Sequence, residues 1–211
     1  GYLPSELTLW ENWRGVHYIR WLEKVHRKPL MEEAKRLAEL LDYDLGRSLR
    51  GLSTGMRRKM GLIASMAHQP ELYIMDEPTI GLDPLMQQVF NGLMRDVRES
   101  GRTVFLSSHN LQEVETICDR VCIIREGQVE AVESIEKLTH VAFRWLELKF
   151  DHPVDQKQFT DISGVNEVSA EDSVLRIQLG GTTDIRAVLN QAVQQGVCDL
   201  DIKHPTLEEI F

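Results

Sequence analysis

Two adjacent carboxylates are the residues in this sequence best placed to do chemistry. Asp76 and Glu77 follow residues 72–75, an apolar run typical of a strand buried on both faces of a parallel sheet. Open α/β sheets bind their ligands at the carboxyl ends of such strands. Neighbouring acids repel each other unless a cation or a proton donor joins them. A divalent metal ion on one acid and a water molecule activated by the other would resolve this conflict.

A run of small residues provides a second chemical feature. Ser53, Thr54 and Gly55 precede apolar residues at helical spacing. At the start of a helix the backbone N–H groups are unpaired, and the helix dipole favours an anion such as phosphate. We therefore expect a phosphate-binding helix start close in sequence to a metal carboxylate and a general base.

His109 is the third candidate for chemistry. It follows residues 103–106, whose β-branched and apolar side chains predict a second buried strand. The carboxyl ends of parallel strands lie at one edge of the sheet, so we expect His109 beside Glu77. A single histidine is more often structural than catalytic, but this position favours a catalytic role.

In this order the segments resemble the ATPase subunit of an ABC transporter, of the ABC-2 or drug-exporter type. Residues 53–56 resemble a variant of the family's LSGGQ signature, and residues 81–83 resemble its D-loop. Asp76 and Glu77 resemble the Walker B pair, and His109 resembles the switch histidine. The resemblance implies ATP as substrate, Mg²⁺ on Asp76, and catalytic roles for Glu77 and His109. It also implies that the nucleotide is contacted by Ser5, Ser53, Thr54, Gly55, Met56 and Asp83.

Two of these contacts have structural alternatives. The family carries a glutamine at the Q-loop position where this sequence has Ser5, and serine has a shorter reach, so an ordinary polar turn after Pro4 is the alternative. Asp83 followed by Pro84 is a good start for a helix, because aspartate caps helix N-termini and proline suits the first turn. The family role of Asp83, contact with the opposite subunit of a dimer, rests on the resemblance.

The phosphate-holding P-loop of the family, G-x-x-x-x-G-K-[ST], lies upstream of the Q-loop. In this sequence no lysine follows a glycine. The resemblance therefore predicts a fragment that begins before the Q-loop but after Walker A, and that is inactive alone. The P-loop amides and lysine hold the β- and γ-phosphates in such enzymes.

Residues 9–28 and the segment after Pro29 have apolar residues at helical spacing, and with the helix after Gly55 they predict a helical subdomain of about residues 9–68. Its tryptophans are expected in the core, on burial habits. The alternative is a surface for a membrane partner, because in the resembling family a groove here receives a coupling helix. The charged residues 57–59 predict a solvated helix turn.

Residues 141–211 predict the order β-α-β-β-α-β of a ferredoxin-like domain. It resembles the accessory domain of some ABC exporter ATPases, which favours export over import. The predicted fold is thus α/β: a partial P-loop NTPase core over residues 1–140 with a helical subdomain, followed by a small α+β domain.

Composition limits the other possibilities. The net charge of −9 argues against a nucleic-acid partner, and no apolar run reaches the ~20 residues of a membrane helix. The three cysteines predict buried free thiols in a reducing compartment. The resemblance implies a cytoplasmic location at the inner membrane face, a homodimer or paired ATPase subunit, and a membrane permease.

The function predicted from these features is ATP hydrolysis in a head-to-tail dimer, coupled to export by the membrane partner. A non-hydrolysing regulatory or interaction module is the alternative, since the chain lacks Walker A and has Ser5 in place of glutamine. A soluble ABC ATPase acting on ribosomes or DNA is a third possibility, but such proteins carry two cassettes or a coiled-coil insertion, and neither is seen.

Overall fold

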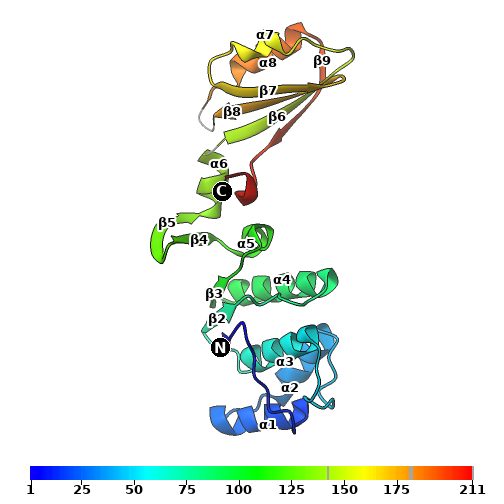
Figure 1. Cartoon of the computed structure of the whole chain (residues 1–211), viewed down its shortest axis with the longest axis vertical. Coiled ribbons are helices and arrows are strands. Elements are labelled where there is room, and N and C mark those ends of the chain that lie inside the picture. Colours follow the sequence, from blue (N-terminus) through cyan, green and yellow to red (C-terminus); the bar gives the residue numbers. More distant parts are fainter. Residues whose placement is uncertain (142, 181–182, 211) are drawn as a thin grey trace. The chain divides into compact units, whose positions relative to one another are not determined.

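The computed structural model describes residues 1–141, 143–180 and 183–210 (Figure 1). It divides into two units, Gly1–Glu113 and Val114–Phe211, here called the N-terminal and C-terminal units. This division falls earlier in the chain than residue 140, where the sequence predicts a domain boundary. The predicted boundary stays a prediction. Phe211, the last residue of the predicted C-terminal domain, lies outside the described residues.

A three-stranded parallel sheet organises the N-terminal unit. Its strands are β1 (Tyr2–Leu3), β2 (Leu72–Asp76) and β3 (Thr103–Ser107), in the order β1-β2-β3. In the β2–β3 register, Asp76 pairs with Ser107. The two carboxyl ends therefore meet at one edge of the sheet, where the chain continues to Glu77 and His109.

Only one face of this sheet is buried among the described residues. Tyr73 and Met75 are buried on that face, whereas Ile74 and Phe105 point to the other face and are exposed. The expectation that both strands are buried on both faces is therefore wrong. The reason is alternation: successive side chains of a strand point to opposite faces, and α3 and α4 contact strands of this sheet.

Four helices accompany the sheet: α1 (Gly15–His26), α2 (Met31–Leu40), α3 (Thr54–Met66) and α4 (Pro84–Glu99). The first is shorter than predicted. Before it, a turn is closed by the Trp13 amide, which donates to the Trp10 carbonyl at 2.9 Å. The Trp13 carbonyl in turn accepts from the Leu49 amide at 2.8 Å. These bonds hold residues 10–13 outside a helix, although the apolar side chains of this segment have helical spacing.

The tryptophans of this region do not form a buried core. Trp10 is 45% exposed, and Trp13 and Trp21 are half-buried. The ring centroids of Trp13 and Trp21 each lie 4.6 Å from that of Trp10, in edge-to-face contact, and Tyr18 lies 5.6 Å away. The preference for a core role is therefore corrected: these side chains form a surface cluster, which we call the aromatic patch, defined by Trp10, Trp13, Tyr18 and Trp21.

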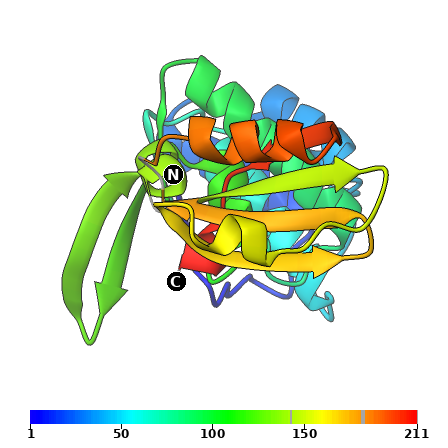
Figure 2. The same ribbon diagram turned by 90° about the horizontal axis from the view of Figure 1, so that it is seen from above.

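Helix α5 (Leu111–Ile117) crosses from the N-terminal into the C-terminal unit. It is followed by the antiparallel hairpin of β4 (Arg120–Arg125) and β5 (Gln128–Ser134), shown in green in Figure 2, and by α6 (Ile135–Val141). The hairpin turns at Glu126 and Gly127, as the sequence predicts.

The rest of the C-terminal unit is a four-stranded antiparallel sheet with helices. Its elements are β6 (Phe143–Phe150), α7 (Lys157–Thr160), β7 (Val165–Glu171), β8 (Val174–Gly180), α8 (Arg186–Gln194), β9 (Val197–Lys203) and a last turn, α9 (Leu207–Ile210). The strand order is β7-β8-β6-β9. Buried strand residues such as Leu146 and Ile177 pack with Phe159 of α7 and Val188 of α8. The predicted β-α-β-β-α-β order is confirmed.

Two further properties concern the whole described chain. No disulfide joins its three cysteines, but Cys122 and Cys198 are exposed rather than buried, because both lie on strands with an open face or edge. Among the described helices, none combines the length and the apolar character that crossing a bilayer requires.

Candidate functional site

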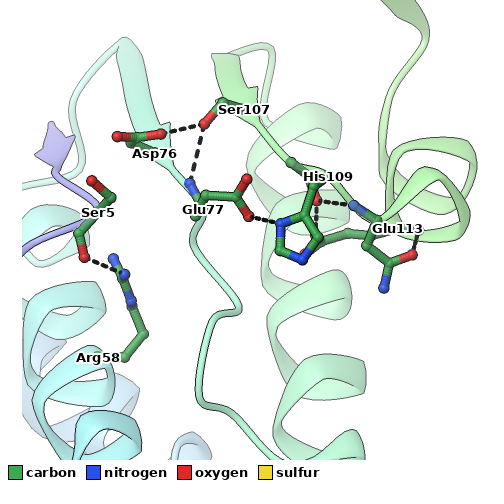
Figure 3. Close-up of polar contacts among 9 residues, drawn as sticks. Ser5, Arg58, Asp76, Glu77, Ser107, His109 and Glu113 are labelled. Atoms are coloured by element: carbon green, nitrogen blue, oxygen red, sulfur yellow. Dashed lines mark hydrogen bonds and ion pairs between the residues drawn. The ribbon is translucent and has the colours of Figure 1, made fainter.

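The site is built where β2 and β3 end side by side (Figure 3). Ser107 lies opposite Asp76, and its hydroxyl donates a hydrogen bond of 2.5 Å to Asp76 Oδ1. The backbone amide of Glu77 donates to the same hydroxyl oxygen at 3.2 Å. A single serine side chain therefore contacts both members of the predicted acid pair.

Glu77 and His109 face each other across the strand ends. The Nδ1 atom of His109 lies 2.8 Å from Glu77 Oε2. Hydrogen bonding to Glu77, and then attraction by its charge, raise the pKa of His109 above its usual value. Glu77 leaves β2 with a left-handed backbone, φ = 49°. This turn is unusual for a residue other than glycine, and such conformations cluster at functional sites.

Asp76 is held as a carboxylate by neutral donors. Its hydrogen bond with the Ser107 hydroxyl, and next that with the Ser5 hydroxyl, keep the pKa of Asp76 below its usual value. Ser5 therefore lies at the site in spite of its short side chain. Mg²⁺ binds through one or two carboxylates together with substrate phosphates, and Asp76 has the charge for that role.

Arg58 is a residue of the site that the sequence analysis missed. It is 3% exposed, and its guanidinium donates to the carbonyls of Pro4 at 2.8 Å and Ser5 at 2.6 Å. Burial lowers the pKa of Arg58, while Asp76 and Glu77 act in the opposite direction. The prediction of a solvated turn is wrong for this residue. Its spacing from buried Leu62 and Ser65 was an available signal, because both share its helix face.

The signature-like segment forms the start of α3. The Ser53 hydroxyl accepts from the Met56 amide at 3.3 Å, which makes Ser53 the N-cap of the helix. Thr54 begins the helix. A Cβ added to Gly55 would lie 2.5 Å from the Gly81 carbonyl oxygen, so this close backbone approach requires glycine. The segment and the loop before Asp83 are therefore packed together.

Asp83 has the structural role that its sequence context predicts. It is the N-cap of α4, and its side chain accepts from the Met86 amide at 3.0 Å, with Pro84 in the first turn. A nucleotide or dimer role for Asp83, like the roles of Met56, Thr54 and Gly55 toward ATP, stays a prediction. Among the described residues, no cluster of three or more potential metal ligands occurs, so Asp76 would need phosphate or water as additional ligands.

Comparison with known proteins gives the class first. A family model described as "AAA domain, putative AbiEii toxin, Type IV TA system" matches residues 24–115. A solved structure titled "Structure of ATP binding subunit of ABC transporter" is 30% identical, with a TM-score of 0.57 over 65% of this chain and 59% of that chain. The N-terminal unit thus has the α/β fold of P-loop NTPases, of the ABC ATPase type.

Three relatives match nearly the whole chain. An ABC transporter ATP-binding protein of Alkalihalophilus pseudofirmus is 27% identical over 100% of this chain and 81% of its own length. The linearmycin resistance ATP-binding protein LnrL of Bacillus subtilis is 27% identical over 100% of this chain and 72% of its length. Nod factor export ATP-binding protein I of a Rhizobium strain is 28% identical over 99% of this chain. Over its whole length the chain is similar to ABC transporter ATP-binding proteins.

Proposed function

We propose that the site hydrolyses ATP, with Glu77 as the base that polarises the attacking water and His109 as the group that orients Glu77 and contacts the γ-phosphate. The observation that carries this proposal is the 2.8 Å contact between His109 and Glu77, directly after the Asp76 carboxylate. A carboxylate fixed by an imidazole keeps its orientation toward a water molecule, which general base catalysis requires. A bound Mg²⁺ would supply charge stabilisation of the phosphates at Asp76.

The start of α3 supports a composite site. Ser53 and Thr54 are exposed at the start of α3, and the free backbone amides of a helix start suit a phosphate. In a head-to-tail dimer, or in a pair with a second ATPase subunit, Ser53, Gly55 and the Thr54 amide would contact ATP held mainly by the other subunit. Met56 and Asp83 would border the same nucleotide. Closure of the dimer around ATP would then move a membrane partner.

The aromatic patch supports a membrane permease as that partner. It lies around an open hollow of about 600 Å³ lined by Leu9, Trp10, Glu11, Asn12, Trp13 and Trp21. Tryptophan and tyrosine are enriched at protein interfaces because they combine a large apolar area with a polar group. The names of two relatives, which mention resistance and export, support export, with this chain at the cytoplasmic face of the membrane.

The test is the substitution Glu77→Gln in the full-length protein. No G-x-x-x-x-G-K-[ST] segment is present in these 211 residues. This chain alone is therefore expected to bind ATP weakly. Hydrolysis should fall by about 100-fold or more while ATP binding is kept. Glu71→Gln, an exposed acid just before β2, is the matched control and should hydrolyse normally. Normal hydrolysis in Glu77→Gln would refute the role of the base. Binding without hydrolysis in the wild type would favour the non-hydrolysing alternative.

A further inference from the structure

The Ser107 side chain contacts the Asp76 carboxylate and the Glu77 backbone amide (Figure 3). Its hydroxyl has one proton, which it donates to Asp76 Oδ1 at 2.5 Å. The oxygen can then only accept from a second partner, and the Glu77 amide donates to it at 3.2 Å. The Ser107 hydroxyl therefore donates toward Asp76 and accepts from the backbone of Glu77.

The bond to the Glu77 amide acts where the backbone leaves β2. Glu77 has a left-handed backbone conformation, which costs free energy for any residue with a Cβ unless surrounding contacts hold it. The amide also donates to the Ser107 carbonyl, again at 3.2 Å, so both hydrogen bonds of the Glu77 amide go to Ser107, while the Glu77 carbonyl accepts from the Ile80 amide at 3.2 Å. The direction of the Glu77 side chain toward His109 follows from the turn.

The neighbouring serine has different partners. The Ser108 hydroxyl donates to Glu113 Oε2 at 2.6 Å and accepts from the Asn110 amide at 3.1 Å. It therefore secures the start of α5 rather than the acid pair. Of the two serines before His109, Ser108 holds the loop to the start of α5 and Ser107 connects it to the end of β2.

We propose that Ser107 is a positioning residue for the hydrolytic reaction: its hydroxyl fixes the Asp76 carboxylate relative to the Glu77 backbone, so that metal ligand and base keep a constant separation. The inference rests on the proposed ATP hydrolysis. It assigns Ser107 no contact with substrate. Loss of the hydroxyl leaves both acids present but removes the bond that links the Asp76 carboxylate to the Glu77 backbone.

The test compares Ser107→Ala with Ser107→Thr in the complete gene product. Removing a residue that orients a metal ligand typically costs 10- to 100-fold, so Ser107→Ala should lower kcat by about tenfold or more and raise the Mg²⁺ concentration at half-maximal rate. KM for ATP should change little. Threonine keeps the hydroxyl and suits a strand, so Ser107→Thr should recover most of the rate. Thr103→Val, an exposed hydroxyl removed from the other end of β3, should behave as wild type.

A second measurement does not depend on hydrolysis. Exchange of the Glu77 amide proton, followed by NMR, should be faster in Ser107→Ala than in wild type and unchanged in Ser107→Thr. Unchanged exchange and unchanged kcat in Ser107→Ala, or a threonine variant no better than alanine, would overturn the inference. If the wild type does not hydrolyse ATP, the proposed function fails, and the exchange rates alone decide whether Ser107 positions Glu77.

Discussion

At the scale of single residues, the contact between Glu77 and His109 gives the site its pH dependence. Glu77 raises the pKa of His109 above its usual 6.5. A group whose pKa is higher in the folded state stabilises that state fully below the unfolded pKa, and this stabilisation disappears as the pH rises through the folded pKa. The charged form of the pair is therefore favoured in mildly acidic solution and is lost toward alkaline pH.

The direction of the His109 pKa shift can be checked by substitution. Glu77→Gln removes the charge that stabilises protonated His109, so the pKa of His109 should fall toward its usual value. NMR titration of the imidazole measures it directly. Glu71→Gln keeps the contact and should leave the titration of His109 unchanged. A His109 pKa that is the same with and without the Glu77 charge would contradict the geometry of the pair.

At the scale of elements, Arg58 ties α3 to the end of β1. Its two hydrogen bonds to the carbonyls of Pro4 and Ser5 join segments far apart in the sequence. Hydrogen bonds from a charged group are stronger than those between neutral groups, and the charge itself is buried. One side chain therefore joins α3 to the segment that carries Ser5.

Arg58→Met should destabilise the N-terminal unit by about 1–3 kcal/mol, because two carbonyls would lose a charged donor while the apolar bulk is kept. Urea denaturation measures the free energy of unfolding. Arg57→Met is the matched control: Arg57 is next along the same helix but exposed, and its replacement should stay within about 0.5 kcal/mol. Equal losses of the free energy of unfolding in both variants would show that Arg58 does not stabilise the contact between α3 and the end of β1.

At the scale of the whole molecule, the aromatic patch is the surface that we propose contacts a membrane permease. Trp10→Ala should weaken binding to the membrane partner reconstituted in nanodiscs by at least about tenfold, because truncation of a tryptophan anchor costs on the order of 2 kcal/mol. ATP binding should be unaffected. Leu85→Ala removes an even more exposed apolar side chain from α4, 65% exposed against 45% for Trp10, and should bind normally. If both variants bind the partner as wild type does, the permease contacts another surface.

The sequence predicted which segments become strands and helices better than it predicted their surroundings. The strand ends at Asp76 and Ser107 follow from apolar runs closed by polar residues, and their pairing places His109 beside Glu77. Burial was less predictable, because it depends on what packs against a side chain. The spacing of Arg58 places it on the buried face of α3, but the backbone carbonyls that accept from it come from a segment far away in the sequence. The tryptophans have helical spacing, but Trp10 and Trp13 lie before α1 and the cluster is at the surface.

The left-handed backbone of Glu77 links catalysis to robustness against mutation. Glycine, asparagine and aspartate adopt this conformation at lower cost than glutamate. A gene under selection for folding alone would drift at this position toward those residues, and the carboxylate would be lost or shortened. If Glu77 is the base that we propose, glutamate here accepts a less stable turn in exchange for a reactive side chain, a trade-off between stability and activity located in a single peptide unit.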